Sequence, residues 1–382
     1  MITIFLVVIL LFEKAFDSVS WAFIDDMLGQ LNFPPKWRLW INGCLRASRS
    51  SVLLNGCPTL EFQCARGVRQ GDPLSPFLFL IVMEAFHALM DKAIKLGIFH
   101  GLGIVRSEMV VSHLTYADDA IVIGDWSSMN IANLIRLLRG FFLVSGLRVN
   151  LNKCGLYGVN VDPEVVKSSA ADCGCLGGEL PFKYLGLLVG ESMNRIHSWK
   201  PVIDIFQSQL SKWKAKHLSM GGRLVLINSV LDSLPQYYFS LYKAPKMVIN
   251  MLECIRFNFL WGGGDGGSTG TKKIHWISRS EICRPKISGG LGLDPLENIN
   301  LALLVKWFWR FCKEPSALWR KVILNIHCPH SLPQWIPCQK GISGVWKNIT
   351  SVEAVLTKKH VRLKDLIYWD GSNWVWRPDQ EG

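Results

Sequence analysis

Two adjacent carboxylates, Asp118 and Asp119, interrupt an apolar run between Leu114 and Ile123. Carboxylate oxygens gathered at one point can bind a divalent cation such as Mg²⁺, or serve as the acid and base of a hydrolase. Aspartate is also common in tight turns for local reasons, so a structural turn between two core strands is the simpler alternative. The residue types alone leave these alternatives open.

The segments around the pair indicate how it is positioned. Residues 110–116 and 120–124 are short and rich in β-branched side chains, which predicts a hairpin with the carboxylates at or beside its turn. Residues 1–12 form an apolar run without a basic n-region, too short to span a bilayer, which predicts a buried central strand and no membrane anchor. Because the chain starts directly on such a strand, we expect upstream sequence to have been lost.

A second polar stretch, residues 66–73 (RGVRQGDP), precedes a long apolar segment. Asp72 followed by Pro73 predicts the N-cap and first turn of a helix from Leu74 to about Lys95. The glycines of the loop ahead of this helix allow the backbone to approach a phosphate closely. As a generic phosphate loop, the stretch is a weak signal by itself.

Composition favours a large protein with a polyanionic partner. A chain of 382 residues that is 49% hydrophobic predicts two or three domains. Lysine and arginine number 42 against 30 acidic residues, a net charge of +12, and 11% aromatics supply stacking surfaces, so nucleic acid is the leading candidate. A solvated basic surface is the alternative. Eleven cysteines without a Cys-x-x-Cys pair fit an intracellular protein, nuclear or cytoplasmic, and nothing indicates an oligomer.

The rest of the chain is predicted to be mostly helical. Helices are predicted over 21–28, 35–46 and 129–145, with Gly146 closing the last, and a short strand pair over 181–190. From Ser198 onward the pattern is helical and basic, and residues 262–267 (GGGDGG) indicate a flexible boundary. The basic positions of this part are Lys200, Lys212, Lys214, Lys216 and Arg223, the last four of which we expect to line a nucleic-acid groove.

The order of these pieces resembles the palm motifs of reverse transcriptases from LINE-type (non-LTR) retrotransposons, particularly those of plants. The resemblance covers about residues 1–300, and its specific part is the first 190. It rests on FEKAFDSV at 12–19, RGVRQGDPLSP at 66–76, YADD at 116–119, residues 146–153 and FKYLG at 182–186. It implies an α+β fold with a palm and partial fingers over 1–190, a helical thumb over 191–265 and a helical C-terminal region of unknown role over 266–382.

The resemblance also implies an activity, RNA-directed DNA polymerisation, with two Mg²⁺ ions as cofactors. Its partners would be an RNA template, a DNA primer and deoxynucleoside triphosphates. By the motifs, Asp118 and Asp119 are the metal ligands and catalytic residues, together with Lys153 as a general acid.

Other motif positions resemble those that hold the substrates. Phe16 matches the residue beneath the incoming sugar. Arg66, Gln70, Gly71 and Tyr116 match positions at the nucleotide and template. The primer grip corresponds to Tyr184, Leu185 and Gly186.

One departure from the family pattern bears on the function. The family places its first metal-binding aspartate four residues before the Ala of the Ala-Phe pair, and counting back from Ala15 gives Leu11. Asp17 lies six residues further on, too far along a strand that advances about 3.3 Å per residue to replace it. We therefore expect Leu11 on the strand alongside the Asp pair, and an inactive polymerase.

Two functions remain open at this point. One is a reverse transcriptase by ancestry that has lost turnover. The alternative is a non-catalytic, maturase-like RNA-binding protein or relic that kept the basic groove. A third function, acid hydrolysis by the Asp pair, is disfavoured because the sequence has no second carboxylate motif at a convincing position.

Overall fold

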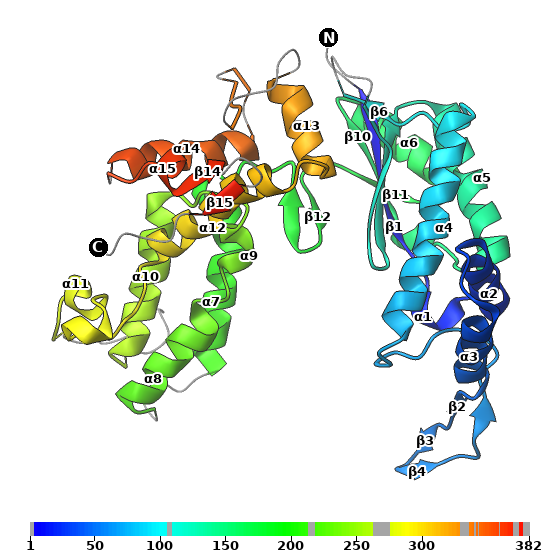
Figure 1. Cartoon of the computed structure of the whole chain (residues 1–382), viewed down its shortest axis with the longest axis horizontal. Coiled ribbons are helices and arrows are strands. Elements are labelled where there is room, and N and C mark those ends of the chain that lie inside the picture. The colour runs from blue at the N-terminus through cyan, green and yellow to red at the C-terminus, as the bar shows by residue number, and fades with distance from the viewer. Residues whose placement is uncertain are drawn as a thin grey trace. The chain divides into compact units, whose positions relative to one another are not determined.

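The computed structural model describes residues 4–104, 109–212, 218–262, 276–328, 336–339, 341–342, 344–358, 360–369 and 374–376. The chain divides into two compact units, Met1–Gly190 and Glu191–Gly382 (Figure 1). Both helices and strands are present, so the predicted α+β class is confirmed. Which functional part each unit represents stays a prediction.

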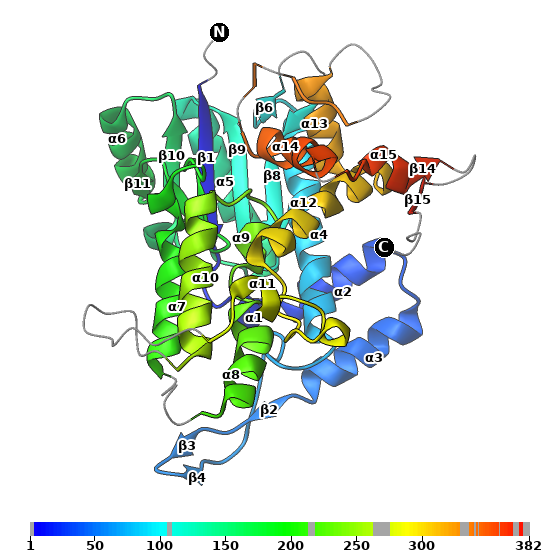
Figure 2. The ribbon, with the colours of Figure 1, turned by 90° about the vertical axis from the view of Figure 1, so that its left-hand side faces the viewer.

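The first unit is built on a five-stranded sheet in the order β11-β10-β1-β9-β8. The apolar run at the amino end forms its central strand, as predicted, and pairs antiparallel with both neighbours, β9 and β10. Figure 2 shows these strands side by side. The strand bounds are β1 Phe5–Leu11, β8 His113–Tyr116, β9 Asp119–Asp125, β10 Gly155–Val159 and β11 Leu176–Gly178.

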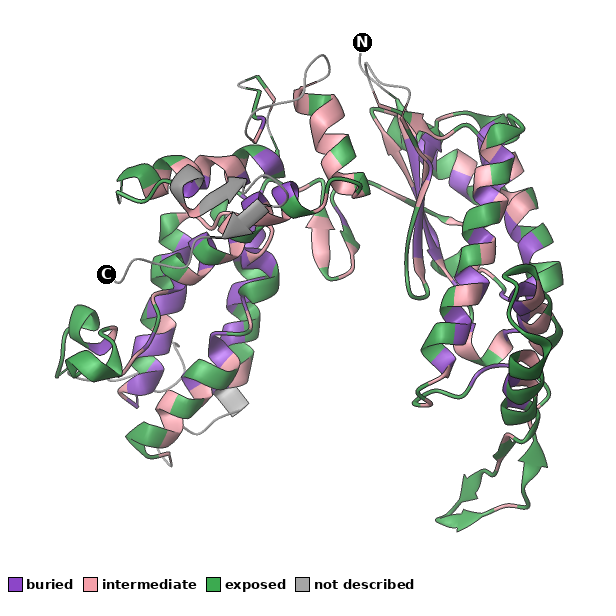
Figure 3. Cartoon of the chain, in the orientation of Figure 1, coloured by how far each residue is buried: buried purple, intermediate pink, exposed green. Residues whose placement is uncertain are grey.

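Strand β1 is buried on both faces, which explains its continuous apolar sequence. Leu6, Val8 and Leu10 belong to a core formed with helices α2, α4, α5 and α6, whereas Val7 and Ile9 belong to a smaller cluster on the other face. Figure 3 shows the buried positions along this strand and on the helices beside it. The helix bounds are α1 Ala15–Ser18, α2 Trp21–Gln30, α3 Pro35–Arg46, α4 Ser75–Lys95, α5 Ser128–Ser145 and α6 Pro163–Cys173.

The predicted span of the long helix α4, Leu74 to about Lys95, is correct to within one residue, but its predicted N-cap is wrong. Its N-cap is Leu74, not Asp72, and the helix begins at Ser75. The Asp72 side chain instead accepts a hydrogen bond from the Leu74 backbone N–H at 2.8 Å. Asp72 therefore closes a separate turn ahead of the helix, a local role that aspartate fills as readily as capping. The predicted end of α5 is confirmed, since Gly146 follows it in the left-handed conformation (φ 80°).

Short hairpins complete the first unit. Their two-residue turns, Asn55-Gly56 and Leu185-Gly186, have positive φ at both positions, which matches the twist of antiparallel strands. Figure 1 shows the β3–β4 hairpin projecting away from the sheet, beyond α3. The strands are β2 Arg49–Ser50, β3 Leu53–Leu54, β4 Cys57–Pro58, β5 Phe62–Gln63, β6 Leu102–Gly103, β7 Val110–Val111, β12 Phe182–Tyr184 and β13 Leu187–Val189.

The second unit is mainly helical, with one exception to the prediction. Strands β14 Ile367–Trp369 and β15 Trp374–Trp376 pair antiparallel in the region expected to be wholly helical. Among the described residues, no helix is long and apolar enough to cross a membrane. The helices are α7 Lys200–Lys212, α8 Met220–Leu226, α9 Gln236–Phe239, α10 Lys246–Leu260, α11 Arg279–Ile282, α12 Leu296–Lys313, α13 Leu318–His327, α14 Val345–Lys358 and α15 Leu363–Leu366.

Candidate active site

The Asp pair lies at a hairpin turn, as the sequence predicts. Strands β8 and β9 pair antiparallel, and Tyr116 and Asp119 are the last partners before the turn. Ala117 and Asp118 form the turn, with Ala117 in the left-handed conformation (φ 51°). Asp118 is exposed and Asp119 is half-buried. The hairpin therefore presents two carboxylates at one end of the sheet.

Leu11 lies directly opposite Asp119 on the neighbouring strand. The antiparallel register of β1 and β9 pairs these two residues, so the prediction that Leu11 lies alongside the Asp pair is confirmed. Directly opposite residues of an antiparallel pair project from the same face with their Cβ atoms about 4.5–5.5 Å apart. The isobutyl group of Leu11 thus lies beside Asp119, at the position where the resemblance to the family motif implies a carboxylate.

Backbone contacts hold Leu11 from both sides. Its carbonyl accepts a hydrogen bond from the Asn150 N–H at 2.8 Å, and its own N–H donates to Sγ of Cys154 at 3.4 Å. Burial raises the pKa of the Cys154 thiol, which keeps it a neutral thiol and not a thiolate metal ligand. The sequence did not predict the contacts of Asn150 and Cys154. The only local signal was the polar turn that contains Asn150.

Lys153 is tied to this same turn. It ends a short 3₁₀ helix, Leu151–Lys153, and its backbone N–H donates to the Asn150 carbonyl at 2.9 Å. Its side chain is exposed. Because Asn150 also bonds Leu11, the turn that carries Lys153 is anchored directly to the end of β1. Its expected role as a general acid stays a prediction.

The electrostatics of the pair favour a bound cation. Burial, and then the charge of Asp118, raise the pKa of Asp119. Both causes destabilise the ionised form of Asp119, and a positive charge bound nearby would offset them.

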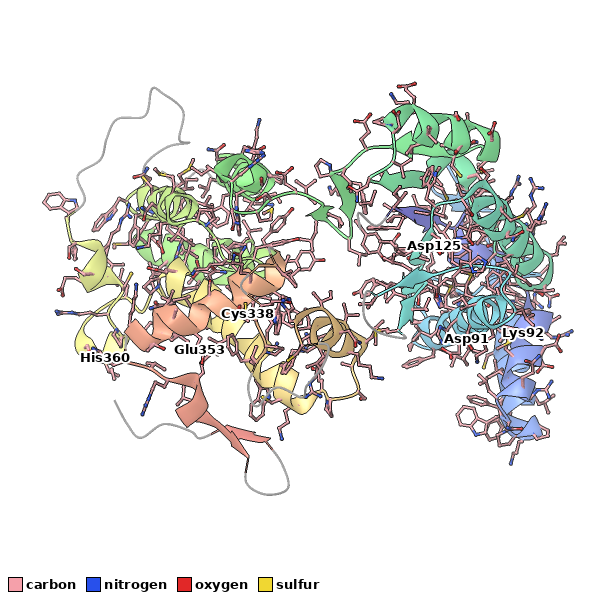
Figure 4. All side chains as sticks on the ribbon, turned by 90° about the horizontal axis from the view of Figure 1, so that it is seen from above. Asp91, Lys92, Asp125, Cys338, Glu353 and His360 are labelled. Atoms are coloured by element: carbon pink, nitrogen blue, oxygen red, sulfur yellow. The ribbon has the colours of Figure 1, made fainter. Side chains whose placement is uncertain are left out.

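Other acids on the neighbouring elements do not join the pair. Asp125, labelled in Figure 4, is the last residue of β9 and follows Asp119, the first, by six residues. At about 3.3 Å per residue the two are about 20 Å apart. Asp91, on α4, forms an ion pair with Lys95 at 2.6 Å. In the described ranges, no group of three or more His, Cys, Asp or Glu side chains could hold a metal ion. Mg²⁺ requires near-octahedral oxygen coordination, so the donor set does not fit two such ions.

The loop ahead of α4 is docked onto the segment that follows β1. The Gly67 N–H donates to the Val19 carbonyl at 2.8 Å, and the Val68 N–H donates to the Phe16 carbonyl at 2.7 Å. The indole N–H of Trp21 donates to the Gly67 carbonyl at 2.6 Å. These bonds bring two motifs together that are about 50 residues apart in the sequence.

The predicted substrate residues around this loop differ in exposure. Phe16 is half-buried and stacks on Phe79, with ring centroids 4.7 Å apart and planes at 14°. Gln70 is exposed, and its amide donates to Asp17 at 3.4 Å. Arg66, Gly71 and Tyr116 are exposed. Asp17 is therefore engaged with the loop, past the end of β1.

The predicted primer-grip hairpin covers the open face of the sheet. Phe182 is buried in the cluster with Val7, Ile9 and Ile121, and Tyr184 packs against the same cluster. Leu185 and Gly186 form the turn. By the alternation of side chains along β1, Leu11 lies on the same face as Val7 and Ile9. The β12–β13 hairpin and Asp119, the partner of Leu11, thus share one face of the palm-like sheet.

The predicted basic groove of the second unit is only partly described. Lys214 and Lys216 lie outside the described residues, as does the side chain of Lys212. Arg223 is half-buried, and its guanidinium donates to the Leu260 carbonyl at 2.7 Å. Arg223 is therefore already used to cap α10.

Comparisons with known proteins agree with the motif order. Residues 6–189 match the family model "Reverse transcriptase (RNA-dependent DNA polymerase)". The Transposon TX1 149 kDa protein of Xenopus laevis is 26% identical over 312 residues, 80% of this chain and 22% of that protein. The Pol polyprotein of retrotransposable element R2DM of Drosophila melanogaster is 29% identical over 298 residues, 70% of this chain and 26% of that protein.

More distant or shorter matches add little. A putative ribonuclease H protein of Arabidopsis thaliana is 31% identical over 150 residues, 39% of this chain and 24% of that protein. The match to a telomerase structure from Candida tropicalis covers 68% of this chain and 39% of the telomerase chain, at 13% identity. Its TM-score of 0.37 is too low for the match to bear on the site. The chain spans about a quarter of the length of the three sequence relatives.

Two glycines of the loop give a matched test of its docking. Both Gly67 and Gly71 have positive φ (83° and 87°), but a Cβ on Gly67 would lie 2.5 Å from the Asp17 carbonyl oxygen, whereas one on Gly71 meets nothing within 4 Å. Gly71→Ala should cost about 1 kcal/mol from the backbone alone, and Gly67→Ala should cost more, because the loop must also move away. Urea unfolding of both variants measures the difference. Equal destabilisation would contradict the close contact.

Proposed function

We propose that this chain, of which residues 6–189 match the reverse transcriptase (RNA-dependent DNA polymerase) family model, is the reverse transcriptase domain of a LINE-type non-LTR retrotransposon. Its partners are an RNA template and a DNA primer. Its polymerisation is limited first by the incomplete metal site.

The observation that carries the proposal is the pairing of Leu11 with Asp119. The surrounding arrangement retains the parts that a template-directed polymerase uses to hold its substrates. The hairpin with the Asp pair, the loop with Gln70 and the hairpin with Tyr184 are all formed by the sheet unit. What the site lacks is one carboxylate at residue 11.

Each remaining part has a role in binding and orientation. The ring of Phe16 is held by its stack on Phe79, which gives it a rigid surface for the incoming sugar. Gln70, fixed by Asp17, orients the nucleotide and template. The turn at Leu185 and Gly186 supports the end of the primer. These contacts need no carboxylate at residue 11, so the substrates still bind with leucine there in place of the aspartate of the family motif.

Polymerisation is affected differently from binding. In the family, two divalent ions neutralise the charge that develops as the nucleotide is transferred. Asp118 and Asp119 can attract one Mg²⁺, but Leu11 has no oxygen with which to bridge a pair of ions. The second candidate function, an RNA-binding protein without turnover, is favoured by this same observation, and the two differ only in whether any primer is extended.

The first prediction concerns binding. The net charge of +12 should make affinity for a primer–template fall steeply with salt, because neutralised phosphates release counterions. If about four phosphates are contacted, the slope of log affinity against log salt is about −3.5. Fluorescence anisotropy between about 50 and 200 mM salt measures it. An affinity that does not change over this range would contradict an electrostatic groove.

The second prediction concerns turnover. Leu11→Asp should produce Mg²⁺-dependent primer extension that the unmodified chain lacks, because the carboxylate opposite Asp119 is restored. Groups of this kind contribute about 10²–10³ in rate, so a partial rescue is visible on a gel.

Two controls accompany this experiment. Leu11→Asn has a side chain of similar shape without the charge and should stay inactive. Adding Asp118→Ala to Leu11→Asp should abolish the extension. Robust extension with Leu11 intact, or equal extension by the Asn and Asp variants, would overturn the role given to residue 11.

A further inference from the structure

The outer face of helix α3 carries two exposed tryptophans. Trp37 and Trp40 are 50% and 52% exposed, and their ring centroids lie 6.0 Å apart with planes at 57°. Ile41 and Leu45 of the same helix are buried in the core of the first unit, so packing within the described residues already accounts for its amphipathic pattern. The indoles are not needed to hold α3 in place, which leaves them available for a partner.

The charge around these tryptophans is mainly basic, although Arg38 of the same helix is paired with Asp25 of α2. The Lys36 ammonium lies 5.1 Å from the centroid of the Trp40 ring, a cation–π arrangement. Residues 35–71 contain six Lys and Arg and one acidic residue, Glu61, a net charge of +5 in about a tenth of the chain. An aromatic pair in an acid-poor surface is complementary to a partner that has both rings and negative charge.

The basic strip is continuous in space as well as in sequence. The Arg69 guanidinium donates to the Arg49 carbonyl at 3.0 Å, which ties the loop ahead of α4 to the strand that follows α3. Arg46 lies at the end of α3, and both it and Arg49 are exposed. A strand laid across α3 would therefore be led by positive charge to the loop that contains Gln70.

We propose that the outer face of α3 is a binding platform for single-stranded RNA, with bases stacked on Trp37 and Trp40 and phosphates held by Lys36, Arg46 and Arg49. This rests on the proposed function, because the strand it would hold is the template on its way to the loop. Stacking on aromatic side chains accepts any base, so the platform has no sequence preference.

A protein partner is the competing occupant. Leu39, on the same helix, is 70% exposed, and an apolar patch can equally dock a protein. The Lys36 ammonium beside Trp40 and the net positive charge of residues 35–71 favour RNA, because lysine is depleted in protein interfaces. The test is designed so that an aliphatic contact and an aromatic contact give different results.

The probe is a fluorescein-labelled single-stranded RNA of about 10 nucleotides, within the usual site size of such surfaces. In the full chain, Trp37→Ala with Trp40→Ala should weaken its binding by about tenfold or more, since each stacked base contributes on that scale. Trp37→Phe with Trp40→Phe should retain most of the affinity. Leu39→Ala, a control that removes an exposed aliphatic side chain from another side of the same helix, should leave it unchanged. Circular dichroism melting checks that each variant is folded.

Photocrosslinking locates the contact independently of any variant. RNA carrying 5-iodouridine should crosslink to the peptide that contains Trp37 and Trp40. Unchanged RNA affinity in the folded double alanine variant, or a loss equal to that of Leu39→Ala, would overturn the platform. The proposed function has a separate outcome. If primer–template binding depends on salt but does not change when Trp37 and Trp40 are replaced, only the platform is contradicted. If RNA binds at the platform but Leu11→Asp extends no primer, only the polymerase assignment is contradicted.

Discussion

The antiparallel register of β1 and β9 is the constraint on which the candidate site depends. It sets Leu11 opposite Asp119, and a slip of one residue would move every side chain of β1 to the other face. Such a slip is prevented because β1 is apolar on both faces and packs into two clusters at once. The hydrogen bond from Asn150 to the Leu11 carbonyl fixes the end of the strand. The geometry of the site is thus set by the core.

The same register makes the charge at residue 11 matter to the stability of the sheet. A carboxylate at residue 11 would sit beside Asp119, whose pKa is already raised by burial and by the charge of Asp118. A third negative charge there destabilises the sheet unless cations bind. Leucine removes that repulsion and fills the same space. Leucine at residue 11 therefore favours the folded state of the unit, and it offers no oxygen ligand beside Asp119.

Much of the first unit could be predicted from local patterns. The apolar run of β1, the hairpin around Asp118 and the glycine after α5 each have a signal within about ten residues. The contacts that hold Leu11 have none, because Cys154 lies 143 residues away in the sequence. The N-cap of α4 differs from the prediction because aspartate closes turns and caps helices by the same kind of hydrogen bond. The β14–β15 pair was missed because tryptophan-rich segments occur in both helices and strands.

The most direct measurement of the central claim is the number of divalent ions bound at the Asp pair, counted by titration with Mn²⁺, a paramagnetic substitute for Mg²⁺ at oxygen sites. The unmodified chain should bind one ion through Asp118 and Asp119, and lose it in Asp118→Ala. Leu11→Asp should bind two. Two ions bound to the chain with Leu11 intact, both lost in Asp118→Ala, would contradict the account, because the site would then be complete without a carboxylate at residue 11.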